Sequence, residues 1–296
     1  MTVTVTVTVL ELIEASAAQL EAAGLTFGNG FGQGTTNAFD EAAWLVLWQL
    51  GLPLDDLDSV SNRPVAQAER AQVATLLGAR INTRKPAAYL THEAWLMGVP
   101  FYVDERVIIP RSFIAELLVD ESIDPWLGED TRRVLDLCTG NGSLAVLAAM
   151  NYPDVMVDAA DISPDALAVA RINIDKHALG SRITLIESDE LLACPGKYDL
   201  ILCNPPYVNA ASMAALPAEF KAEPVLALGG GADGMDFIRS LFLTVAAHMS
   251  ENAVLVLEIG NERDNFERAF PQLEPLWFET SAGSDQVMLI TREQLV

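Results

Sequence analysis

The 296-residue sequence lacks the features that mark several large classes of protein. It has three cysteines and three histidines, with no Cys-x-x-Cys pair and no metal-ligand spacing, which argues against a disulfide framework and against a metal centre. It has no apolar run of about 20 residues and no leader with a basic start and an apolar centre. These absences predict a cytoplasmic protein that does not associate with membranes.

Positive charge is also scarce. The chain has 18 Lys and Arg against 41 Asp and Glu, a formal net charge of −23. Such a chain repels phosphate backbones, so tight nucleic-acid binding is not expected. The acidity favours either a basic protein partner or a salt-adapted surface with no specific partner, and the composition leaves both open. Hydrophobic residues make up 51% of the chain, enough to bury a large core.

Residues 1–88 predict a small helical domain. Thr and Val alternate over residues 2–9 with strand periodicity, but no partner strand is evident. Helices are predicted over residues 10–23, after Asp40 as a capping residue, and over residues 64–84. The glycine-rich stretch at 24–37 is predicted to be a loop, and it is not a phosphate loop because no strand precedes it.

Residues 89–111 predict a β-hairpin linker that turns around Gly98. A helix is expected from residue 112 to 123, and residues 112–296 then read as an α/β domain. Short apolar runs alternate there with helical patterns, which indicates a mostly parallel sheet covered on both faces. The predicted strands are 134–138, 155–161, 182–188, 198–203, 253–260 and 286–291.

A glycine turn between the first of these strands and its helix indicates a ligand site. It reads Asp136-Leu-Cys-Thr-Gly140-Asn-Gly142, and glycines there let a ligand approach the N–H groups of a helix start. Asp161 ends the next strand 21 residues after Gly140, where a carboxylate can accept hydrogen bonds from ribose hydroxyls. The two features together indicate a nucleoside cofactor.

The glycine turn alone does not identify that cofactor. Gly140-x-Gly142-x-x-Ala145 also fits a dinucleotide fingerprint, so a dehydrogenase stays open, as does a turn that binds nothing. Asp136 favours a cofactor that carries positive charge, such as S-adenosylmethionine, unless its carboxylate only caps the turn.

The tetrapeptide Asn204-Pro205-Pro206-Tyr207 favours the S-adenosylmethionine site over the dehydrogenase and over a turn that binds nothing. It follows a predicted strand, at the sheet edge where ligands of open parallel sheets bind. The Asn204 side-chain oxygen and the Pro205 carbonyl are two acceptors that could grip an NH₂ group, and the Tyr207 ring could stack on the planar group that bears it. Held in this way, an amide or amine nitrogen is aimed at a methyl donor. A dehydrogenase would leave the tetrapeptide without a role.

The sequence at this point resembles the HemK/Prm family of protein-(glutamine-N5) methyltransferases. The resemblance covers nearly the whole chain after the first ten residues and includes DLCTGNG (136–142), DISPDALAVA (161–170), YDLILCNPPYV (198–208) and EPVLALGGGADGMDFIR (223–239). The segment PAAYLTHEAWLMGVPFYVDERVIIPRS (86–112) is most similar to the branch that acts on a large-subunit ribosomal protein, the PrmB type. The resemblance implies a Rossmann-like, seven-stranded methyltransferase domain that uses S-adenosylmethionine, and an N-terminal domain that recognises the substrate.

The resemblance also implies roles for particular residues. The glycine turn would line the methionine and ribose parts of the cofactor, Asp161 would hold the ribose, and Asp189 and Glu190 would lie near the adenine. The tetrapeptide would hold the target glutamine. Arg111 and Glu223 would border the pocket or simply form an ion pair, and Gly229–Gly231 would make a turn. The candidate cofactor-binding residues are Asp136, Cys138, Thr139, Gly140, Asn141, Gly142, Asp161, Asp189, Glu190 and Asn204; Asn204, Pro205, Pro206 and Tyr207 are the candidate substrate-binding residues, with Asn204, Pro205 and Tyr207 as the catalytic ones.

Three other functions remain open at this stage. Methylation of a release factor uses the same chemistry on another protein. Methylation of adenine in DNA needs a basic groove, but residues 101–296 hold 13 Lys and Arg against 31 Asp and Glu. A non-catalytic factor for ribosome assembly that binds the cofactor is the third. The sequence therefore predicts a methyltransferase for a basic ribosomal protein.

Overall fold

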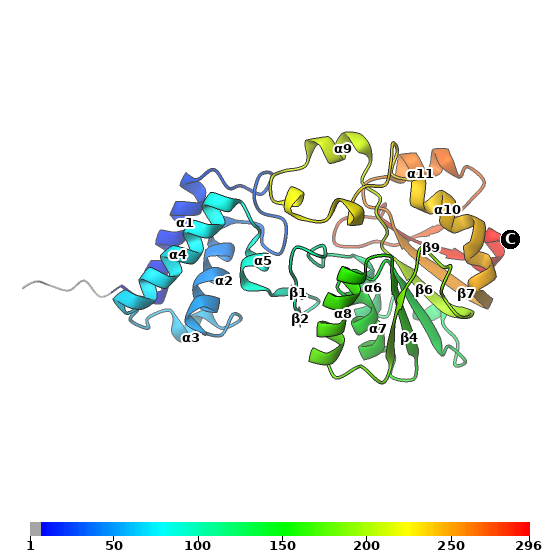
Figure 1. Cartoon of the computed structure of the whole chain (residues 1–296), viewed down its shortest axis with the longest axis horizontal. Helices are drawn as coiled ribbons and strands as arrows, with labels where there is room; N and C mark the ends of the chain where they lie inside the picture. Colours follow the sequence, from blue (N-terminus) through cyan, green and yellow to red (C-terminus); the bar gives the residue numbers. More distant parts are fainter. Residues whose placement is uncertain (1–6) are drawn as a thin grey trace, which may run out of the picture. The chain divides into compact units, whose positions relative to one another are not determined.

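The computed structural model describes residues 7–296, which divide into two compact units. One unit contains the described residues up to Glu93 together with Pro217–Ala222, and the other contains Ala94–Leu216 and Glu223–Val296 (Figure 1). Most of the Thr/Val alternation lies outside the described residues; within them, Thr8 forms a single antiparallel bridge with Pro64. Among the described residues, no helix combines the length and the apolar character of a membrane span.

The first unit is helical, as its sequence predicts. Its helices are α1 (Val9–Ala22), α2 (Ala38–Leu50), α3 (Leu57–Val60), α4 (Gln67–Thr83) and α5 (Ala87–Thr91), with the short helix η2 (Phe220–Ala222). The N-cap of α2 is Asn37 and not Asp40, because the Asn37 Oδ1 accepts the Asp40 N–H at 2.9 Å. Ile13 and Leu20 of α1 pack with Leu45 of α2 in the core. The glycine-rich stretch 24–37 is irregular, as predicted.

The second unit is built on a seven-stranded mixed sheet. Its strands are β3 (Arg133–Leu137), β4 (Met156–Asp161), β5 (Ile183–Glu187), β6 (Tyr198–Cys203), β7 (Met249–Glu258), β8 (Leu276–Trp277) and β9 (Val287–Thr291). Their order is β5-β4-β3-β6-β7-β9-β8. The strands from β5 to β7 pair parallel, whereas β9 pairs antiparallel with both of its neighbours, β7 and β8. The six predicted strands are all present. The two-residue β8 is not in the prediction because it is too short to show a period.

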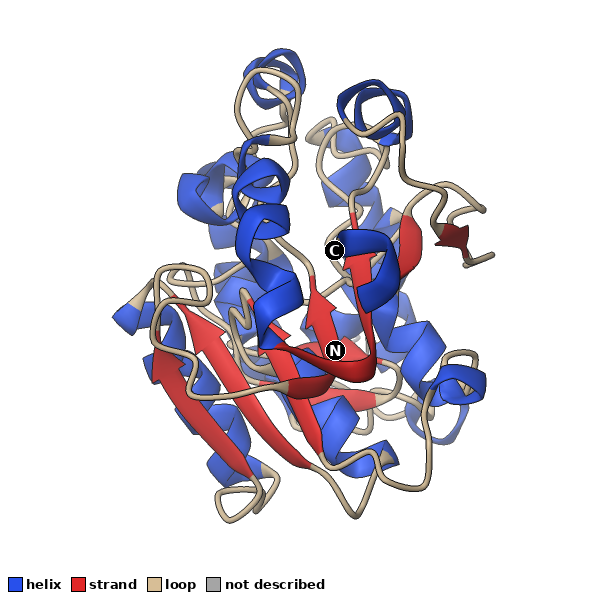
Figure 2. Cartoon of the chain, turned by 90° about the vertical axis from the view of Figure 1, so that its right-hand side faces the viewer, coloured by secondary structure: helices blue, strands red, loops and turns tan. Residues whose placement is uncertain are grey.

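Helices cover both faces of this sheet (Figures 1 and 2). Val134 faces a core that includes α6 (Ile114–Val119), α7 (Ser143–Asn151) and α8 (Pro164–Lys176). Leu135 faces a core that includes α10 (Asp236–Thr244) and α11 (Arg263–Ala269). Neighbouring residues of β3 thus enter opposite cores, as expected for a strand that is buried on both faces. The remaining elements are η1 (Asp124–Trp126), α9 (Ala210–Ala215), η3 (Val225–Ala227), η4 (Val245–His248) and η5 (Arg292–Leu295).

A hairpin opens the second unit. Strands β1 (Ala94–Leu96) and β2 (Val99–Phe101) pair antiparallel around Gly98, as predicted. Asn173 of α8 is fully buried and connects the chain that follows the hairpin to the glycine turn. Its side chain accepts from the Tyr102 N–H at 2.7 Å and donates to the carbonyls of Tyr102 at 3.0 Å and Asn141 at 2.8 Å. The segment after the hairpin is therefore held beside the edge of the sheet that carries the predicted site.

That edge is fixed by the sheet topology. The chain proceeds from β3 outward to β4 and β5, and then returns to form β6 on the other side of β3. Leu137 at the end of β3 pairs with Cys203 at the end of β6. This is a topological switch point, where the loops at the carboxyl ends of neighbouring strands diverge and leave a crevice.

Candidate active site

The glycine turn follows β3 directly and has the backbone geometry that its glycines predict. Gly140 has φ +54°, and a Cβ built on it would meet no atom within 4 Å, so its surface is open to a ligand. Gly142 has a different role. Its φ is +80°, and a Cβ there would lie 3.1 Å from the Ala170 Cβ, so this glycine lets the turn pack against α8. Cys138 also has a left-handed φ of +62°, which is uncommon for a residue with a side chain.

Asp161 at the end of β4 holds the turn from the neighbouring strand. Its Oδ2 accepts the Gly140 N–H at 2.9 Å, and its Oδ1 accepts the Ser163 N–H at 2.9 Å. Burial raises the pKa of this carboxyl, while the backbone hydrogen bonds from Ser163 and Gly140 lower it; burial outweighs them. Each carboxylate oxygen keeps a further lone pair for a ligand.

These loops line a cavity of about 280 Å³. Seven of the predicted site residues line it, and they come from the carboxyl ends of β3, β4, β5 and β6 and from the loops that follow them: Cys138, Gly140, Asp161, Asp189, Glu190, Asn204 and Pro206. The lining is mostly apolar and is completed by Val107, Ile108, Ala166, Leu226 and Phe237, among others. An apolar pocket with a few converging polar groups is typical of a small-molecule site.

A second cavity of about 30 Å³ shares Cys138, Gly140 and Asn204 with the first. Thr139 and Asn141 line this smaller cavity, although they do not line the larger one. The Asn141 Nδ2 is buried and has no hydrogen-bond acceptor among the described residues. A buried donor without a partner is unfavourable unless a ligand or water satisfies it. The glycine turn therefore fits a ligand that brings an acceptor to this end.

Asp136, a predicted cofactor-binding residue, lies in the core next to the glycine turn. It is fully buried and lines neither cavity; its Oδ2 accepts from the Thr139 Oγ1 at 2.5 Å and the Ala145 N–H at 2.9 Å. Its carboxylate thus caps the turn and the start of α7, the alternative that the sequence left open. Burial raises its pKa to about 7, although these two hydrogen bonds lower it.

The tetrapeptide follows β6, and its residues diverge in direction. Asn204 and Pro206 line the larger cavity, whereas Pro205 is buried and, like Tyr207, lines neither cavity. The Tyr207 hydroxyl lies 3.3 Å from the Glu258 Oε1. The hydroxyl of this tyrosine is therefore held by a buried carboxyl at the end of β7.

Glu258 is a residue that sequence reasoning missed. It is 1% exposed, and its Oε2 accepts from the Ser112 Oγ at 2.6 Å and the Phe113 N–H at 2.9 Å. Burial raises its pKa to about 6, against the opposing effect of these hydrogen bonds. An acidic residue at the end of an otherwise apolar strand was the available signal.

Close packing around Tyr207 explains why three nearby positions are occupied by glycine. A Cβ on Gly260 would lie 2.5 Å from the Tyr207 Cε2, one on Gly234 would lie 2.3 Å from its carbonyl oxygen, and one on Gly230 would lie 2.7 Å from its Cα. The run Gly229–Gly231 was expected to make a turn, but the turn and bends lie on either side of it, at Leu228 and at residues 232–234. The run instead pairs with the chain after the tetrapeptide: Gly229 forms a bridge with Val208, and the Gly230 N–H donates to the Val208 carbonyl at 2.9 Å. The glycines let the loop before α10 and the chain after β7 pack closely against one tyrosine.

Arg111 and Glu223 form the ion pair that the sequence left as one of two alternatives. Two hydrogen bonds of 2.6 and 2.7 Å join the guanidinium to the carboxylate, and Glu223 also accepts the Ile109 N–H at 3.1 Å. Arg111 lines the smaller cavity as well, so it both borders the pocket and makes the pair.

The segment after the hairpin contributes residues to the lining of the larger cavity that were not predicted from the sequence. Arg106 lines the larger cavity, and its guanidinium binds the Asp104 carboxylate at 2.6 Å. That contact holds the Asp104 pKa down at about 2, although burial opposes it. Tyr102 donates its hydroxyl to the same carboxylate at 3.0 Å. The alternation of Tyr, Asp and Arg in YVDER was the signal for this cluster.

Comparison with known proteins identifies the fold and the family. Residues 115–231 match the family model described as "Methyltransferase small domain". The catalytic domain of hMettl16, solved in complex with a MAT2A 3'UTR hairpin, superposes with a TM-score of 0.51 over 78% of this chain and 84% of its own, at 13% sequence identity. At that identity, the likeness shows a shared fold alone.

Curated relatives are far more similar in sequence. The ribosomal protein uL3 glutamine methyltransferase of Bordetella pertussis is 50% identical over 291 residues, which cover 97% of this chain and 96% of the relative. That of Neisseria meningitidis serogroup A is 48% identical, over 98% of this chain and 94% of the relative. Similarity of this extent confirms the resemblance seen in the motifs: the chain belongs to the family of ribosomal protein uL3 glutamine methyltransferases.

Proposed function

We propose that this chain transfers a methyl group from S-adenosylmethionine to the side-chain amide nitrogen of a glutamine in ribosomal protein uL3. One observation carries the proposal: Asn204, from the tetrapeptide, and Gly140 and Asp161, from the cofactor-binding pattern, line a single cavity. The substrate is taken from the names of relatives that match nearly the whole chain.

The residues around the two cavities suit S-adenosylmethionine, which supplies an electrophilic methyl group on a sulfonium. Asp161 would accept hydrogen bonds from the ribose, and Asp189 and Glu190 would lie at the adenine. Asn141, whose Nδ2 is buried without an acceptor among the described residues, would donate to the carboxylate of the methionine part. Apolar lining residues would exclude water from the reacting atoms.

Asn204 and Pro205 would act on the substrate. The nitrogen of an amide is a poor nucleophile because its lone pair is delocalised. The Asn204 side-chain oxygen and the Pro205 carbonyl would each accept one hydrogen of the amide, which favours a tetrahedral nitrogen and aims its lone pair at the methyl group. The same acceptors stabilise the positive charge that develops on the nitrogen.

The acidity of the chain suits a basic substrate. The net charge of −23 gives an attractive field for a protein whose surface binds RNA, and such a field raises the rate of encounter. The same field repels a nucleic-acid backbone, which argues against DNA as the substrate.

The function is tested by incubating the chain with labelled S-adenosylmethionine and one substrate at a time: uL3, a release factor or duplex DNA. We expect label in uL3 alone, located on a glutamine side chain by mass spectrometry of its peptides. Label in the release factor but not in uL3 would contradict the proposal, as would label on DNA.

Replacing Asn204 by alanine tests the mechanism. Asn204→Ala removes an acceptor for the amide, and loss of one such contact lowers kcat by on the order of 10²–10³. Affinity for S-adenosylhomocysteine should change only slightly, because the loops after β3, β4 and β5 remain. Single-turnover rates and calorimetry measure the two effects. Turnover at the unmodified rate would exclude this role for Asn204.

Replacing Asp161 by alanine tests the cofactor site. Each charge-assisted hydrogen bond to the ribose is worth roughly 1.5–3 kcal/mol, so Asp161→Ala should weaken S-adenosylhomocysteine binding by about a hundredfold or more. Because Asp161 also binds the Gly140 N–H, the melting temperature without ligand is measured in parallel. If stability falls while the dissociation constant is unchanged, Asp161 only holds the turn.

Replacing Glu258 by glutamine tests whether burial raises the pKa of this carboxyl. The pKa of Glu258 is raised from 4.5 to about 6, so its protonated form stabilises the folded state. This contribution of Glu258 to the free energy of unfolding is about 2 kcal/mol. It is fully present below pH 4.5 and is lost as the pH rises through about 6. The unfolding free energy of the unmodified chain relative to Glu258→Gln should therefore fall by about that amount between pH 4.5 and about 7.

Urea unfolding at a series of pH values measures this difference. Glu251→Gln makes the same chemical change at an exposed position of β7 and serves as the control. A difference between the unmodified chain and Glu258→Gln that stays constant with pH would show that burial does not shift this carboxyl.

A further inference from the structure

A short segment of the C-terminal half belongs to the helical unit. Pro217–Ala222 is grouped with the residues up to Glu93, whereas the chain on both sides of it belongs to the methyltransferase unit. The chain thus enters the helical unit between α9 and η3 and leaves it again within six residues. We name Pro217–Ala222 the clamped segment.

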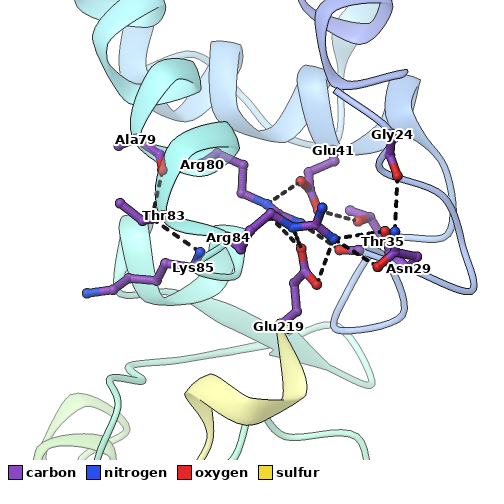
Figure 3. Close-up of polar contacts among 11 residues, drawn as sticks. Gly24, Asn29, Thr35, Glu41, Ala79, Arg80, Thr83, Arg84, Lys85 and Glu219 are labelled. Carbon is purple, nitrogen blue, oxygen red and sulfur yellow. Dashed lines mark hydrogen bonds and ion pairs between the residues drawn. The ribbon is translucent and has the colours of Figure 1, made fainter. Parts of the chain in front are cut away.

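Glu219 fastens the clamped segment to α4 and to the residue that ends this helix (Figure 3). Its carboxylate is 1% exposed and accepts from the Arg84 Nε at 2.5 Å, the Arg84 Nη2 at 3.0 Å and the Arg80 Nη1 at 3.1 Å. Arg84 directly follows α4 as its C-cap residue. Three hydrogen bonds from two cations therefore hold a single side chain of the clamped segment.

Arg80 connects this contact to the rest of the helical unit. Its side chain is fully buried; the Nε donates to the Glu41 Oε1 of α2 at 2.7 Å, and the Nη2 donates to the Gly30 carbonyl at 2.5 Å. One guanidinium thus binds α2, the glycine-rich stretch and the clamped segment. We name Glu41, Arg80, Arg84 and Glu219 the charge cluster.

The charge cluster is balanced only while Glu219 is ionised and in place. Two carboxylates face two guanidinium groups, and a buried charge without a counter-charge is strongly unfavourable. Burial raises the pKa of Glu219, but hydrogen bonds from Arg84 and Arg80 outweigh it and hold that pKa below its ordinary value. Burial also raises the pKa of Glu41, and the single guanidinium of Arg80 does not reverse that shift.

Both ends of the clamped segment lead into the catalytic cavity. On one side the chain runs back through α9 to Pro206 and Asn204, which line the cavity. On the other side the chain continues to Glu223, which is paired with Arg111. Pro224 and Leu226, which come next to and shortly after Glu223, also line the cavity. The segment therefore separates two stretches that both contribute to the lining of one cavity.

We propose that Glu219 is a positioning residue for methyl transfer: by binding Arg80 and Arg84, it restrains the chain between Tyr207 and Glu223, whose two ends continue into the stretches that border the site of the target amide. Without this anchor, the chain between Tyr207 and Glu223 gains conformational freedom, and the reacting groups spend less time in the productive geometry. The rate consequence rests on the proposed function, whereas the anchoring of the chain does not.

The test uses three full-length variants. Glu219→Gln removes the anchor and leaves a surplus positive charge in the cluster. The double variant Glu219→Gln/Arg84→Gln also lacks the anchor, but it leaves Arg80 balanced by Glu41. Glu69→Gln makes the same chemical change on α4 at a partly exposed ion pair with Arg63 and is the matched control.

Hydrogen exchange of backbone amides gives a readout that needs no substrate. We expect faster exchange over residues 208–229 in both Glu219 variants and unchanged exchange over residues 134–142 of β3 and the glycine turn. We expect kcat on the protein substrate to fall by on the order of 10–100-fold in both, with affinity for S-adenosylhomocysteine much less affected. Glu69→Gln should match the unmodified chain in exchange over residues 208–229, in kcat and in affinity for S-adenosylhomocysteine.

The double variant separates positioning from simple stability. Charge balance should restore its melting temperature relative to Glu219→Gln, while exchange over residues 208–229 stays fast and kcat stays low. Recovery of kcat together with the melting temperature would overturn the proposal, because the cluster would then only stabilise the helical unit. Unchanged exchange in Glu219→Gln would overturn it as well. If the unmodified chain does not methylate uL3, the proposed function fails, and the exchange data still decide the anchoring of the chain.

Discussion

The parallel pairing of β3 with β6 is the interaction on which the rest of the structure depends. Leu137 pairs with Cys203, so the loops that leave these strands start side by side although 66 residues separate them in sequence. The pairing places Gly140 and Asn204 on one cavity. Each loop alone is a common turn. Only their adjacency at the switch point gives the single cavity on which the proposed methyl transfer rests.

Three carboxylates that are buried or partly buried bind the loops that form this site. Asp136 caps the start of α7, Asp161 holds the Gly140 N–H, and Glu258 binds the chain at Phe113 and the Tyr207 hydroxyl. Burial raises the pKa of all three carboxyls. Backbone N–H groups that donate to them oppose this effect without reversing it. Carboxylates in such places stabilise loops that would otherwise leave N–H groups without partners. Two of these carboxylates, Asp136 and Glu258, line neither cavity, so the loops of the site are also held by groups outside its lining.

Much of the fold was predictable from local sequence. Apolar runs such as residues 198–203 gave the strands, because a strand buried on both faces has no polar alternation. Gly140 and Asp161 were predictable as cavity residues because their spacing follows from strand-turn-helix geometry. The tetrapeptide and the motifs around it indicated the family, which relatives with about half of their residues identical confirm. These predictions succeeded because each depends on residues that are close in the chain.

Contacts between residues distant in the chain needed the tertiary structure. Tyr207 is directed to Glu258, 51 residues away, and Arg80 pairs with Glu219, 139 residues away. No period or spacing encodes such pairs, since any of the 41 acidic residues could meet a given arginine or tyrosine. The sequence by itself determined the main strands and helices, the position of the glycine turn and the family, and it supplied the proposed contacts to an amide. The tertiary structure decided which carboxylates are buried, that Asp136 caps a turn, and that six residues near the site belong to the helical unit, because packing alone brings those groups together.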